Sequence, residues 1–220
     1  MIVALLGDPV SASLSPLMQN AAFAARGLDW TYVALRVGAD DLEDALRGLT
    51  ALGFAGANVT TPHKLAAARL LGGGAESVNT LVVGNGRLHG TSTDAAILAG
   101  LEFERAAILG DGGAATAFAA ALPTAQRFSR RGTWPPDLAA VDLVVNATSA
   151  RDEVLVELEP GQTLVDLPYP ATATAREAES RGARVVDGLD VLVAQGAASF
   201  EWWTGVPAPV DVMRAAVRSA

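Results

Sequence analysis

The stretch Arg105-Ala-Ala-Ile-Leu109-Gly110-Asp-Gly112-Gly113-Ala-Ala115 decides the fold of the second half of the chain. Its first five residues are a mostly apolar run of strand length, and the Ala-rich residues 116–122 that follow favour a helix. The glycines between them match the pattern G-x-G-x-x-A, in which small residues let the backbone approach a pyrophosphate at a helix N-terminus. Glycine turns also join strands to helices for steric reasons alone, so this motif indicates a nucleotide only together with other signals.

The segment about twenty residues after this turn bears on the kind of nucleotide. NAD-binding proteins usually place an acid there, whereas this chain has Ser129, Arg130 and Arg131. Two guanidinium groups and a hydroxyl can hold a 2′-phosphate through charge-assisted hydrogen bonds, which favours NADP over NAD. The alternative is a solvated arginine pair at a strand end. Asp111, inside the turn, must point away from a pyrophosphate or it weakens binding.

Short apolar strands alternate with Ala- and Leu-rich helical stretches along the chain, which predicts an α/β protein. The predicted strands span residues 2–6, 31–35, 56–59, 80–83, 106–109, 125–128, 143–146, 163–166 and 184–186. The predicted helices span residues 15–27, 40–52, 61–71 and 94–100, and later ones begin near residues 113, 172, 189 and 210. A domain change is expected near residues 92–104, and the final helices could belong to either half.

The composition excludes several classes of protein. A chain of 220 residues, 50% hydrophobic and 18% charged, can bury a core in one or two domains and is not disordered. Its net charge of −8 repels nucleic acid and anionic membranes. With no cysteine and two histidines, a metal centre is not expected. The N-terminus lacks the basic segment of a signal peptide and no apolar run could span a bilayer, so we expect a cytoplasmic protein.

Lys64 is the single lysine beside fifteen arginines, and it lies in the motif Asn58-Val-Thr60-Thr61-Pro62-His63-Lys64. An ammonium group can release a proton, which a guanidinium effectively cannot. With Thr61 as N-cap and Pro62 as the first helical residue, Lys64 is predicted in the first turn of a helix. The positive end of the helix dipole makes it a better proton donor there. A solvent-facing lysine is the alternative.

Further polar side chains lie where strands end or helices begin. Ser13 and Ser15 precede a helix and point the same way if the segment is extended, which suits a small carboxylate, although capping would account for one of them. Asn58, Asn79 and Asn146 each lie at or beside a strand terminus, where α/β proteins place groups that bind ligands. Asp94 lies at a helix start, where its carboxylate could act simply as a helix cap.

Together these motifs resemble the shikimate dehydrogenase family. The family's substrate domain has motifs similar to five segments of this chain, in the same order: Gly7-Asp-Pro-Val10, Ser13-Leu-Ser15-Pro16, the Lys64 motif, Val78-Asn79-Thr80 and Thr93-Asp94. Its cofactor domain and closing segment are similar to residues 110–114, Ser129-Arg130, Asn146-Ala-Thr148-Ser149, Asp166-Leu-Pro-Tyr169 and residues 188–197. The resemblance therefore covers nearly the whole chain.

The resemblance implies two α/β domains with a cleft between them and reversible reduction of 3-dehydroshikimate to shikimate with NADP as cofactor. Residues 1–94, with C-terminal helices of residues 192–220 returning to them, would form the substrate domain, and residues 95–191 a Rossmann-like NADP-binding domain. Lys64 and Asp94 would be the catalytic pair. The implied substrate ligands are Ser13, Ser15 and Tyr169 for the carboxylate, and Thr60, Asn79 and Gln195, beside the catalytic pair, for the ring hydroxyls. The implied cofactor ligands are Gly110, Gly112, Gly113, Ala114, Ser129, Arg130, Arg131, Asn146, Ala147, Thr148 and Gly188.

Length is the main departure from the family. Only eleven residues separate Arg131 from the strand at Leu143, where the family fits a helix, a strand and a return. The NADP-binding domain is therefore expected to be shortened near residues 131–142, beside the adenosine half of the cofactor. Quinate or an amino-shikimate remains an alternative substrate, and a non-catalytic shikimate-binding homologue is the rival function. The sequence leaves the oligomeric state open, a homodimer included.

Overall fold

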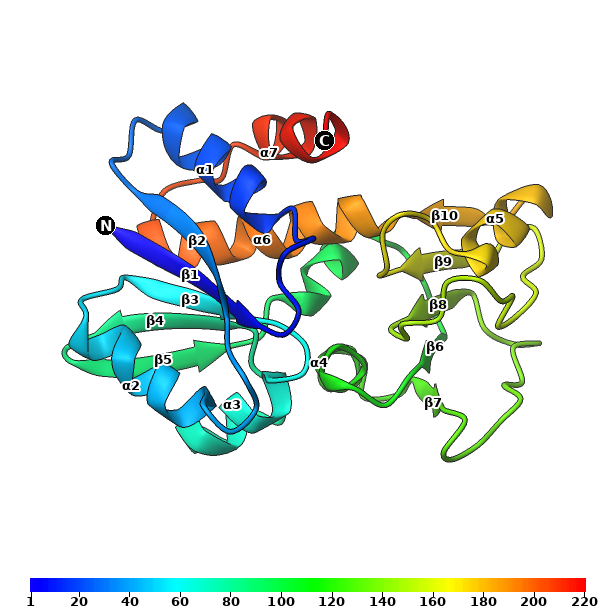
Figure 1. Cartoon of the computed structure of the whole chain (residues 1–220). Coiled ribbons are helices and arrows are strands. Elements are labelled where there is room, and N and C mark those ends of the chain that lie inside the picture. The colour runs from blue at the N-terminus through cyan, green and yellow to red at the C-terminus, as the bar shows by residue number, and fades with distance from the viewer. The chain divides into compact units, whose positions relative to one another are not determined.

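The computed structural model describes all 220 residues, which divide into two compact units. The first unit comprises Met1–Asp94 and Val193–Ala220, and the second comprises Ala95–Leu192 (Figure 1). Each unit has its own five-stranded sheet and its own buried core. None of the helices is both long and apolar enough to cross a membrane.

The first sheet has the order β2-β1-β3-β4-β5. Its parallel strands are β1 (Ile2–Gly7), β2 (Thr31–Arg36) and β3 (Gly56–Val59), and its antiparallel strands are β4 (Thr80–Gly84) and β5 (Arg87–Thr91). Because the chain proceeds from β1 to β2 on one side and then to β3 on the other, the strand order reverses between β1 and β3. Parallel α/β sheets bind ligands beyond the carboxyl ends of the strands at such a point.

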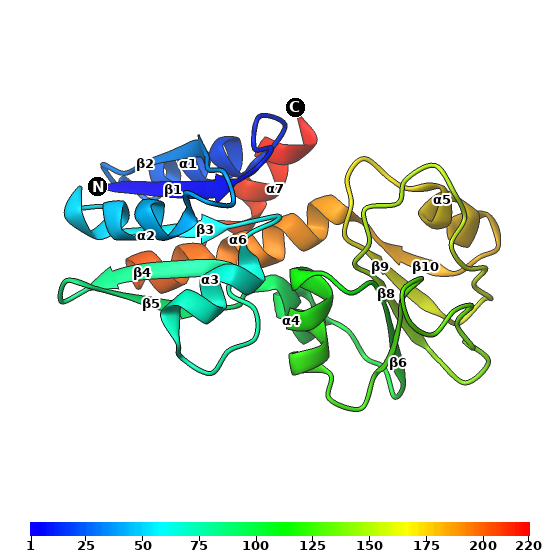
Figure 2. The ribbon, with the colours of Figure 1, turned by 60° about the horizontal axis from the view of Figure 1, so that its bottom comes forward.

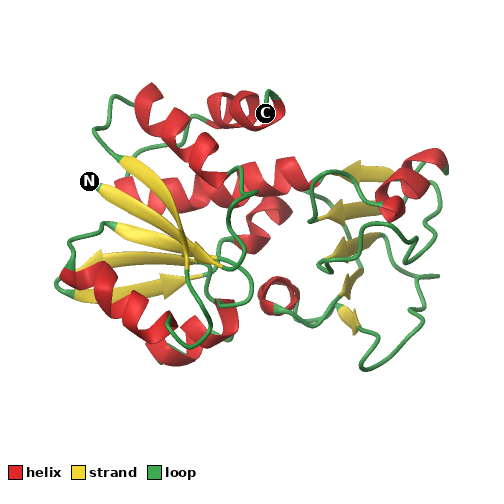
Figure 3. Ribbon diagram, in the orientation of Figure 1, coloured by secondary structure: helices red, strands yellow, loops and turns green.

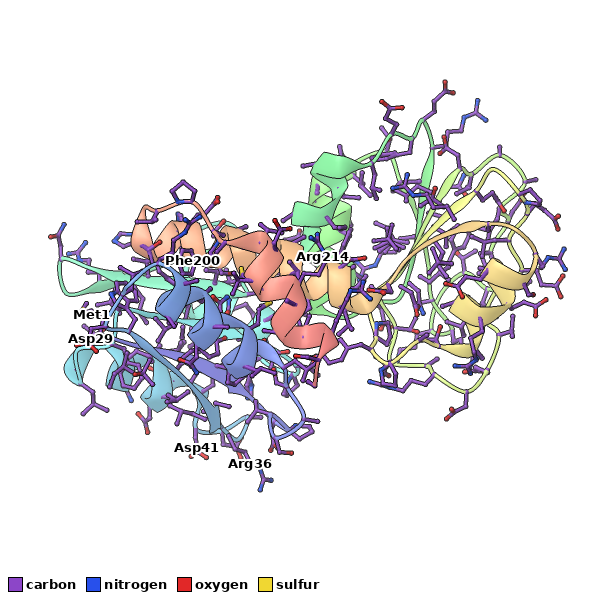
Figure 4. The ribbon with its side chains drawn as sticks, turned by 90° about the horizontal axis from the view of Figure 1, so that it is seen from above. Met1, Asp29, Arg36, Asp41, Phe200 and Arg214 are labelled. Atoms are coloured by element: carbon purple, nitrogen blue, oxygen red, sulfur yellow. The ribbon has the colours of Figure 1, made fainter.

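Helices cover both faces of the first sheet (Figure 1). α2 (Leu42–Ala51) and α3 (Lys64–Leu71) pack on one face, where their apolar side chains join a buried cluster with strand residues such as Leu6 and Leu81. α1 (Ser15–Ala25), α7 (Val210–Arg218) and the part of α6 (Gly188–Thr204) that belongs to this unit lie on the other. Phe200 of α6 stacks on Phe23 of α1 with ring centroids 5.4 Å apart, and Figure 4 shows Phe200 beside the ribbon of α1.

The structure corrects two details of the sequence analysis in this unit. The strand β5 was not predicted; it pairs with β4 through a turn at Asn85 (φ 52°) and Gly86 (φ 70°), two residues that readily adopt the positive φ values of a tight hairpin. α3 begins at Lys64 with His63 as N-cap, and not at Pro62. The reason is a turn in which the His63 N–H donates to the Thr60 carbonyl at 2.9 Å, so Thr61 and Pro62 precede the helix.

The second sheet is entirely parallel and has the order β10-β9-β8-β6-β7. Its strands are β6 (Ala106–Leu109), β7 (Gln126–Phe128), β8 (Leu143–Asn146), β9 (Thr163–Asp166) and β10 (Arg184–Val186). α4 (Gly113–Ala121) packs on one face together with the 3₁₀ helix η1 (Asp94–Gly100), and α5 (Ala173–Ser180) packs on the other (Figure 2). The strand order reverses between β6 and β8, so the α/β prediction with a Rossmann-like sheet is confirmed.

The connection between β7 and β8 is a loop, as the short sequence there predicts. Residues 129–142 contain neither helix nor strand, and Figure 3 shows this segment as one long green loop. Trp134, Leu138 and Val141 from the loop nevertheless pack against the core that includes Phe128 and α5. Apolar side chains of the loop thus cover part of one face of the sheet without forming a helix.

Candidate active site

Lys64 and Asp94 form a close ion pair in the first unit. Lys64 is the first residue of α3, just beyond the carboxyl end of β3, and Asp94 follows β5 at the start of η1. The Lys64 Nζ lies 2.6 Å from Asp94 Oδ1 and 2.7 Å from Oδ2, and the two side chains are 13% and 4% exposed. Because an ammonium group has three N–H donors, two hydrogen bonds to the carboxylate leave one for a substrate oxygen.

Asn79 holds this pair in place from the position just before β4. Its Nδ2 donates to Asp94 Oδ1 at 2.8 Å, and its Oδ1 accepts from the Thr93 N–H at 2.8 Å. Gln195 of α6 lies beside it, with Oε1 3.2 Å from Asn79 Nδ2. The structure therefore brings together four of the predicted site residues, which come from α3, η1, α6 and the residue preceding β4.

A buried network of hydroxyl and amide groups supports Asn79, and the sequence analysis did not identify its central member, Ser199. The Ser199 side chain is 1% exposed, and its Oγ lies 2.8 Å from Thr80 Oγ1 and 3.0 Å from Thr93 Oγ1. Asn58 Nδ2 also donates to Ser199 Oγ at 3.1 Å. The available signal was a lone serine four residues after Gln195 on a mostly apolar helix, which places both on one face.

Ser13, Ser15 and Thr60 follow the two strands at the reversal point of the first sheet. Ser13 Oγ accepts the N–H of Ser15, the first residue of α1, at 3.2 Å, while Leu14 is the N-cap. Ser15 is therefore not the capping residue. Thr60 comes directly after β3, and a Cβ at Gly7 would clash with Thr60 Cγ2, so the absence of a side chain at Gly7 lets the two loops meet.

The glycine turn of the second unit has the shape that a dinucleotide phosphate requires. Gly110 has φ +125°, and a Cβ there would lie 3.0 Å from the Ala147 carbonyl oxygen, so glycine is needed at this position. Gly112 is the N-cap of α4 and makes no side-chain cap, and a Cβ there would meet nothing within 4 Å. Gly113 and Ala114 begin the helix. This open helix N-terminus fits the diphosphate of NADP.

Arg127 on β7 is a second residue that the sequence analysis missed. Its Nε donates to the Gly110 carbonyl at 3.0 Å, and its Nη2 lies 3.3 Å from Thr116 Oγ1. It therefore fixes the turn and adds positive charge beside the start of α4. No sequence pattern distinguishes it from the other arginines, because its role depends on β7 lying next to β6.

Asn146, Ala147 and Thr148 lie at the end of β8, next to the glycine turn. Asn146 is fully buried; its Nδ2 donates to Asp166 Oδ1 at 2.7 Å, and its Oδ1 accepts from the Thr148 hydroxyl at 2.8 Å. Its side chain is thus occupied within the protein, which makes it a residue that positions Thr148. Burial raises the pKa of Asp166, although hydrogen bonds from Asn146 and Thr172 oppose the change.

The three residues predicted to bind a 2′-phosphate follow β7. Arg130 Nη2 lies 2.6 Å from Glu153 Oε2, and Arg131 Nη1 lies 3.5 Å from Asp111 Oδ2. Ser129 is half-buried and accepts the Gly132 N–H at its carbonyl. Asp111 is therefore directed toward Arg131, and both arginines are already paired with carboxylates.

The last two predicted residues, Gly188 and Tyr169, also belong to the second unit. Gly188 begins α6, and a Cβ there would clash with the Pro168 carbonyl oxygen, so its lack of a side chain allows the helix to start against this backbone. Tyr169 follows Pro168 and is half-buried.

A doubly wound parallel sheet with a glycine turn at its reversal point, and a separate unit carrying a buried Lys–Asp pair, define a dinucleotide-dependent oxidoreductase of the α/β class. Residues 5–81 match the model of the shikimate dehydrogenase substrate binding domain, and residues 188–218 match that of the shikimate 5′-dehydrogenase C-terminal domain. Relatives more than 35% identical are aligned over the full chain. The chain belongs to the shikimate dehydrogenase family.

Individual relatives agree with this assignment. Shikimate dehydrogenase (NADP(+)) of Moorella thermoacetica is 41% identical, with 100% of this chain and 93% of that protein covered, and the protein of the same name from Methanocella arvoryzae is 37% identical, with 100% and 98% covered. The crystal structure of shikimate 5-dehydrogenase from Thermus thermophilus in complex with NADP(H) and shikimate has a TM-score of 0.86 at 31% identity, covering 100% of this chain and 99% of that one. The Moorella alignment spans 279 positions against the 220 residues here, so that relative carries segments absent from this chain.

Proposed function

We propose that this chain catalyses the reversible, NADPH-dependent reduction of 3-dehydroshikimate to shikimate, a step in the biosynthesis of chorismate and the aromatic amino acids. The observation that carries the proposal is the buried Lys64–Asp94 pair with Asn79 and Gln195 beside it. The first unit would bind the substrate and the second the cofactor, because the pair lies in the former and the glycine turn in the latter.

The Lys64 ammonium acts as the proton donor in this proposal. Bound NADPH supplies the hydride for the ketone carbon. Lys64 then stabilises the alkoxide that forms and gives it a proton, while both oxygens of Asp94 hold the ammonium in position. In the reverse direction Lys64 accepts the hydroxyl proton. A positioned acid of this kind contributes about 10²- to 10⁴-fold to the rate.

The remaining residues bind and orient the ligands. Thr60, Asn79 and Gln195 are proposed to bind the ring hydroxyls, and Ser13, Ser15 and Tyr169 the carboxylate. Gly110, Gly112, Gly113, Ala114 and the Asn146–Thr148 turn would hold the diphosphate and the adjoining ribose, with Gly188 shaping the same region. Ser129, Arg130 and Arg131 would bind the 2′-phosphate.

The test follows NADPH absorbance at about 340 nm with shikimate and NADP⁺, beside quinate and NAD⁺. We expect turnover with shikimate and NADP⁺, and a loss of about 10²- to 10⁴-fold in kcat for Lys64→Ala. Arg69→Ala is the matched control, because Arg69 is an exposed cation on the same helix. Full turnover by Lys64→Ala would refute the assignment of Lys64. Turnover with quinate and not with shikimate would identify quinate as the substrate. If folded protein shows no turnover with any combination of substrate and cofactor, the chain would be a non-catalytic homologue.

Two further features are proposed and need separate measurements. The first is a cytoplasmic location, as the sequence analysis expects, and cell fractionation tests it. Light scattering after size-exclusion chromatography decides between a monomer and the homodimer that the sequence left open.

A further inference from the structure

The 2′-phosphate region of the second unit carries less positive charge than its sequence suggests. Arg130 and Arg131 contribute two positive charges, while Glu153 and Asp111, their partners at 2.6 Å and 3.5 Å, contribute two negative charges. These four side chains together are therefore neutral. A phosphate that carries about two negative charges meets a carboxylate next to each arginine.

The contact between Arg130 and Glu153 is the closer of the two, and both of its sides are built into the fold. The Arg130 guanidinium lies over the Trp134 ring, 5.6 Å from its centroid, and Trp134 packs against the core. Glu153 is tethered through its main chain, because the Thr174 hydroxyl on α5 lies 3.3 Å from its carbonyl oxygen. The same hydroxyl accepts the Leu155 N–H at 3.0 Å, so the loop that presents Glu153 is fixed to a buried helix residue.

We propose that Glu153 lowers the preference of this protein for NADP over NAD by competing with the 2′-phosphate for Arg130. The inference rests on the proposed binding of that phosphate by Arg130. Glu153 engages one N–H group of a guanidinium that has five, so a phosphate can still bind. When it binds, the carboxylate stands beside a dianion and repels it. NAD presents a neutral 2′-hydroxyl at this place and is not opposed.

The size of the effect follows from exposure. The Arg130 and Glu153 side chains are 59% and 47% exposed, so water and salt screen the pair strongly. Exposed ion pairs of this kind change equilibria by about two- to fivefold. We therefore expect Glu153→Gln to tighten the binding of adenosine 2′,5′-bisphosphate by about two- to fivefold at low salt. The gain should disappear near ~1 M salt.

Isothermal titration calorimetry of the full chain with adenosine 2′,5′-bisphosphate and with 5′-AMP tests the proposal without requiring turnover. Glu157→Gln is the matched control, because Glu157 lies in the same loop, makes the same change of charge and pairs with Arg181 at 3.0 Å instead. Tighter binding of the bisphosphate by Glu153→Gln alone, with 5′-AMP unchanged, is the expected result. Equal effects of the two variants, equal effects on the two nucleotides, or no effect would overturn it.

Arg130→Gln separates this inference from the function on which it rests. If Arg130→Gln weakens binding of the bisphosphate while Glu153→Gln leaves it unchanged, Arg130 binds the phosphate and Glu153 does not compete. If Arg130→Gln binds the bisphosphate as well as the unmodified protein does, the assignment of Arg130 is wrong and the inference is lost with it. Titrations with NADP⁺ and NAD⁺ should reproduce the same selectivity.

Discussion

Removing Lys64 should cost stability as well as activity, and a second substitution should restore only the stability. The ion pair has Nζ–O distances of 2.6 and 2.7 Å, and its side chains are 13% and 4% exposed. At an effective dielectric constant of about 20 its attraction is about 6 kcal/mol, most of which offsets the desolvation of the two charges. Lys64→Met leaves the Asp94 carboxylate buried without its counter-ion.

Loss of one partner from a buried ion pair costs about 3–5 kcal/mol. Asn79 still donates to Asp94 Oδ1, so we expect the lower end, about 3 kcal/mol. In the double variant Lys64→Met/Asp94→Asn neither charge remains and the side-chain volumes are similar. Its free energy of unfolding should therefore lie within about 1 kcal/mol of the unmodified protein, while its turnover stays at the level of Lys64→Met.

Urea unfolding followed by tryptophan fluorescence suits this test, because Trp30, Trp202 and Trp203 all lie in the first unit. Arg69→Met controls for the loss of a cation from α3. If the free energy of unfolding of the double variant is no higher than that of Lys64→Met, removing the Asp94 charge does not restore stability. The unpaired carboxylate would then not be the cause of the loss, and the reasoning would be refuted.

Three further predictions concern the supporting structure. Ser199→Ala should raise the KM for shikimate about threefold and leave the KM for NADP⁺ unchanged, because the network under Asn79 loses the contacts of the Ser199 hydroxyl with Thr80, Thr93 and Asn58. Thr204→Ala, which removes a hydroxyl that donates to a carbonyl of the same helix, should change neither KM. Gly110→Ala forces a side chain into φ +125° and should destabilise the second unit by about 1–3 kcal/mol in calorimetry, with weaker NADP⁺ binding. Burial alone would raise the pKa of Asp142, but hydrogen bonds from backbone N–H groups outweigh burial and lower the pKa. The ionised carboxylate therefore stabilises the fold above the unfolded-state pKa of about 3.9. This stabilisation is lost as the pH falls through the folded-state pKa. Acid unfolding of Asp142→Asn should lack that loss.

Elements with strong local signals were predictable, and those that depend on pairing were less so. The strand at residues 106–109 combines a mostly apolar sequence with a glycine turn, and the structure has the same bounds. β5, with the sequence Arg87-Leu-His-Gly-Thr91, is weakly apolar and forms because it pairs with β4. Its one local signal was Asn85-Gly86, which is typical of hairpin turns.

The candidate site divides in the same way. Residue type and position drew attention to Lys64 and Asn79, whereas the family resemblance implied the role of Asp94. The structure brings both Lys64 and Asn79 within hydrogen-bonding distance of Asp94. Ser199 and Arg127 could not be found by this reasoning, because their importance comes from neighbours far away in sequence. The Ser199 hydroxyl meets Thr80, 119 residues earlier in the chain, only after α6 packs on the first sheet.

The reversal point of the second sheet, where we propose that the cofactor binds, lies between β6 and β8, away from the loop that follows β7. The glycine turn and the Asn146–Thr148 turn follow β6 and β8, which are direct neighbours in the sheet. The loop of residues 129–142 lies beyond β7, at the outer edge of the sheet. Trp134, Leu138 and Val141 cover the apolar face there, and Trp134 also supports Arg130. Substitutions in this loop should therefore change the ratio of NADP to NAD affinity more than they change binding of the diphosphate.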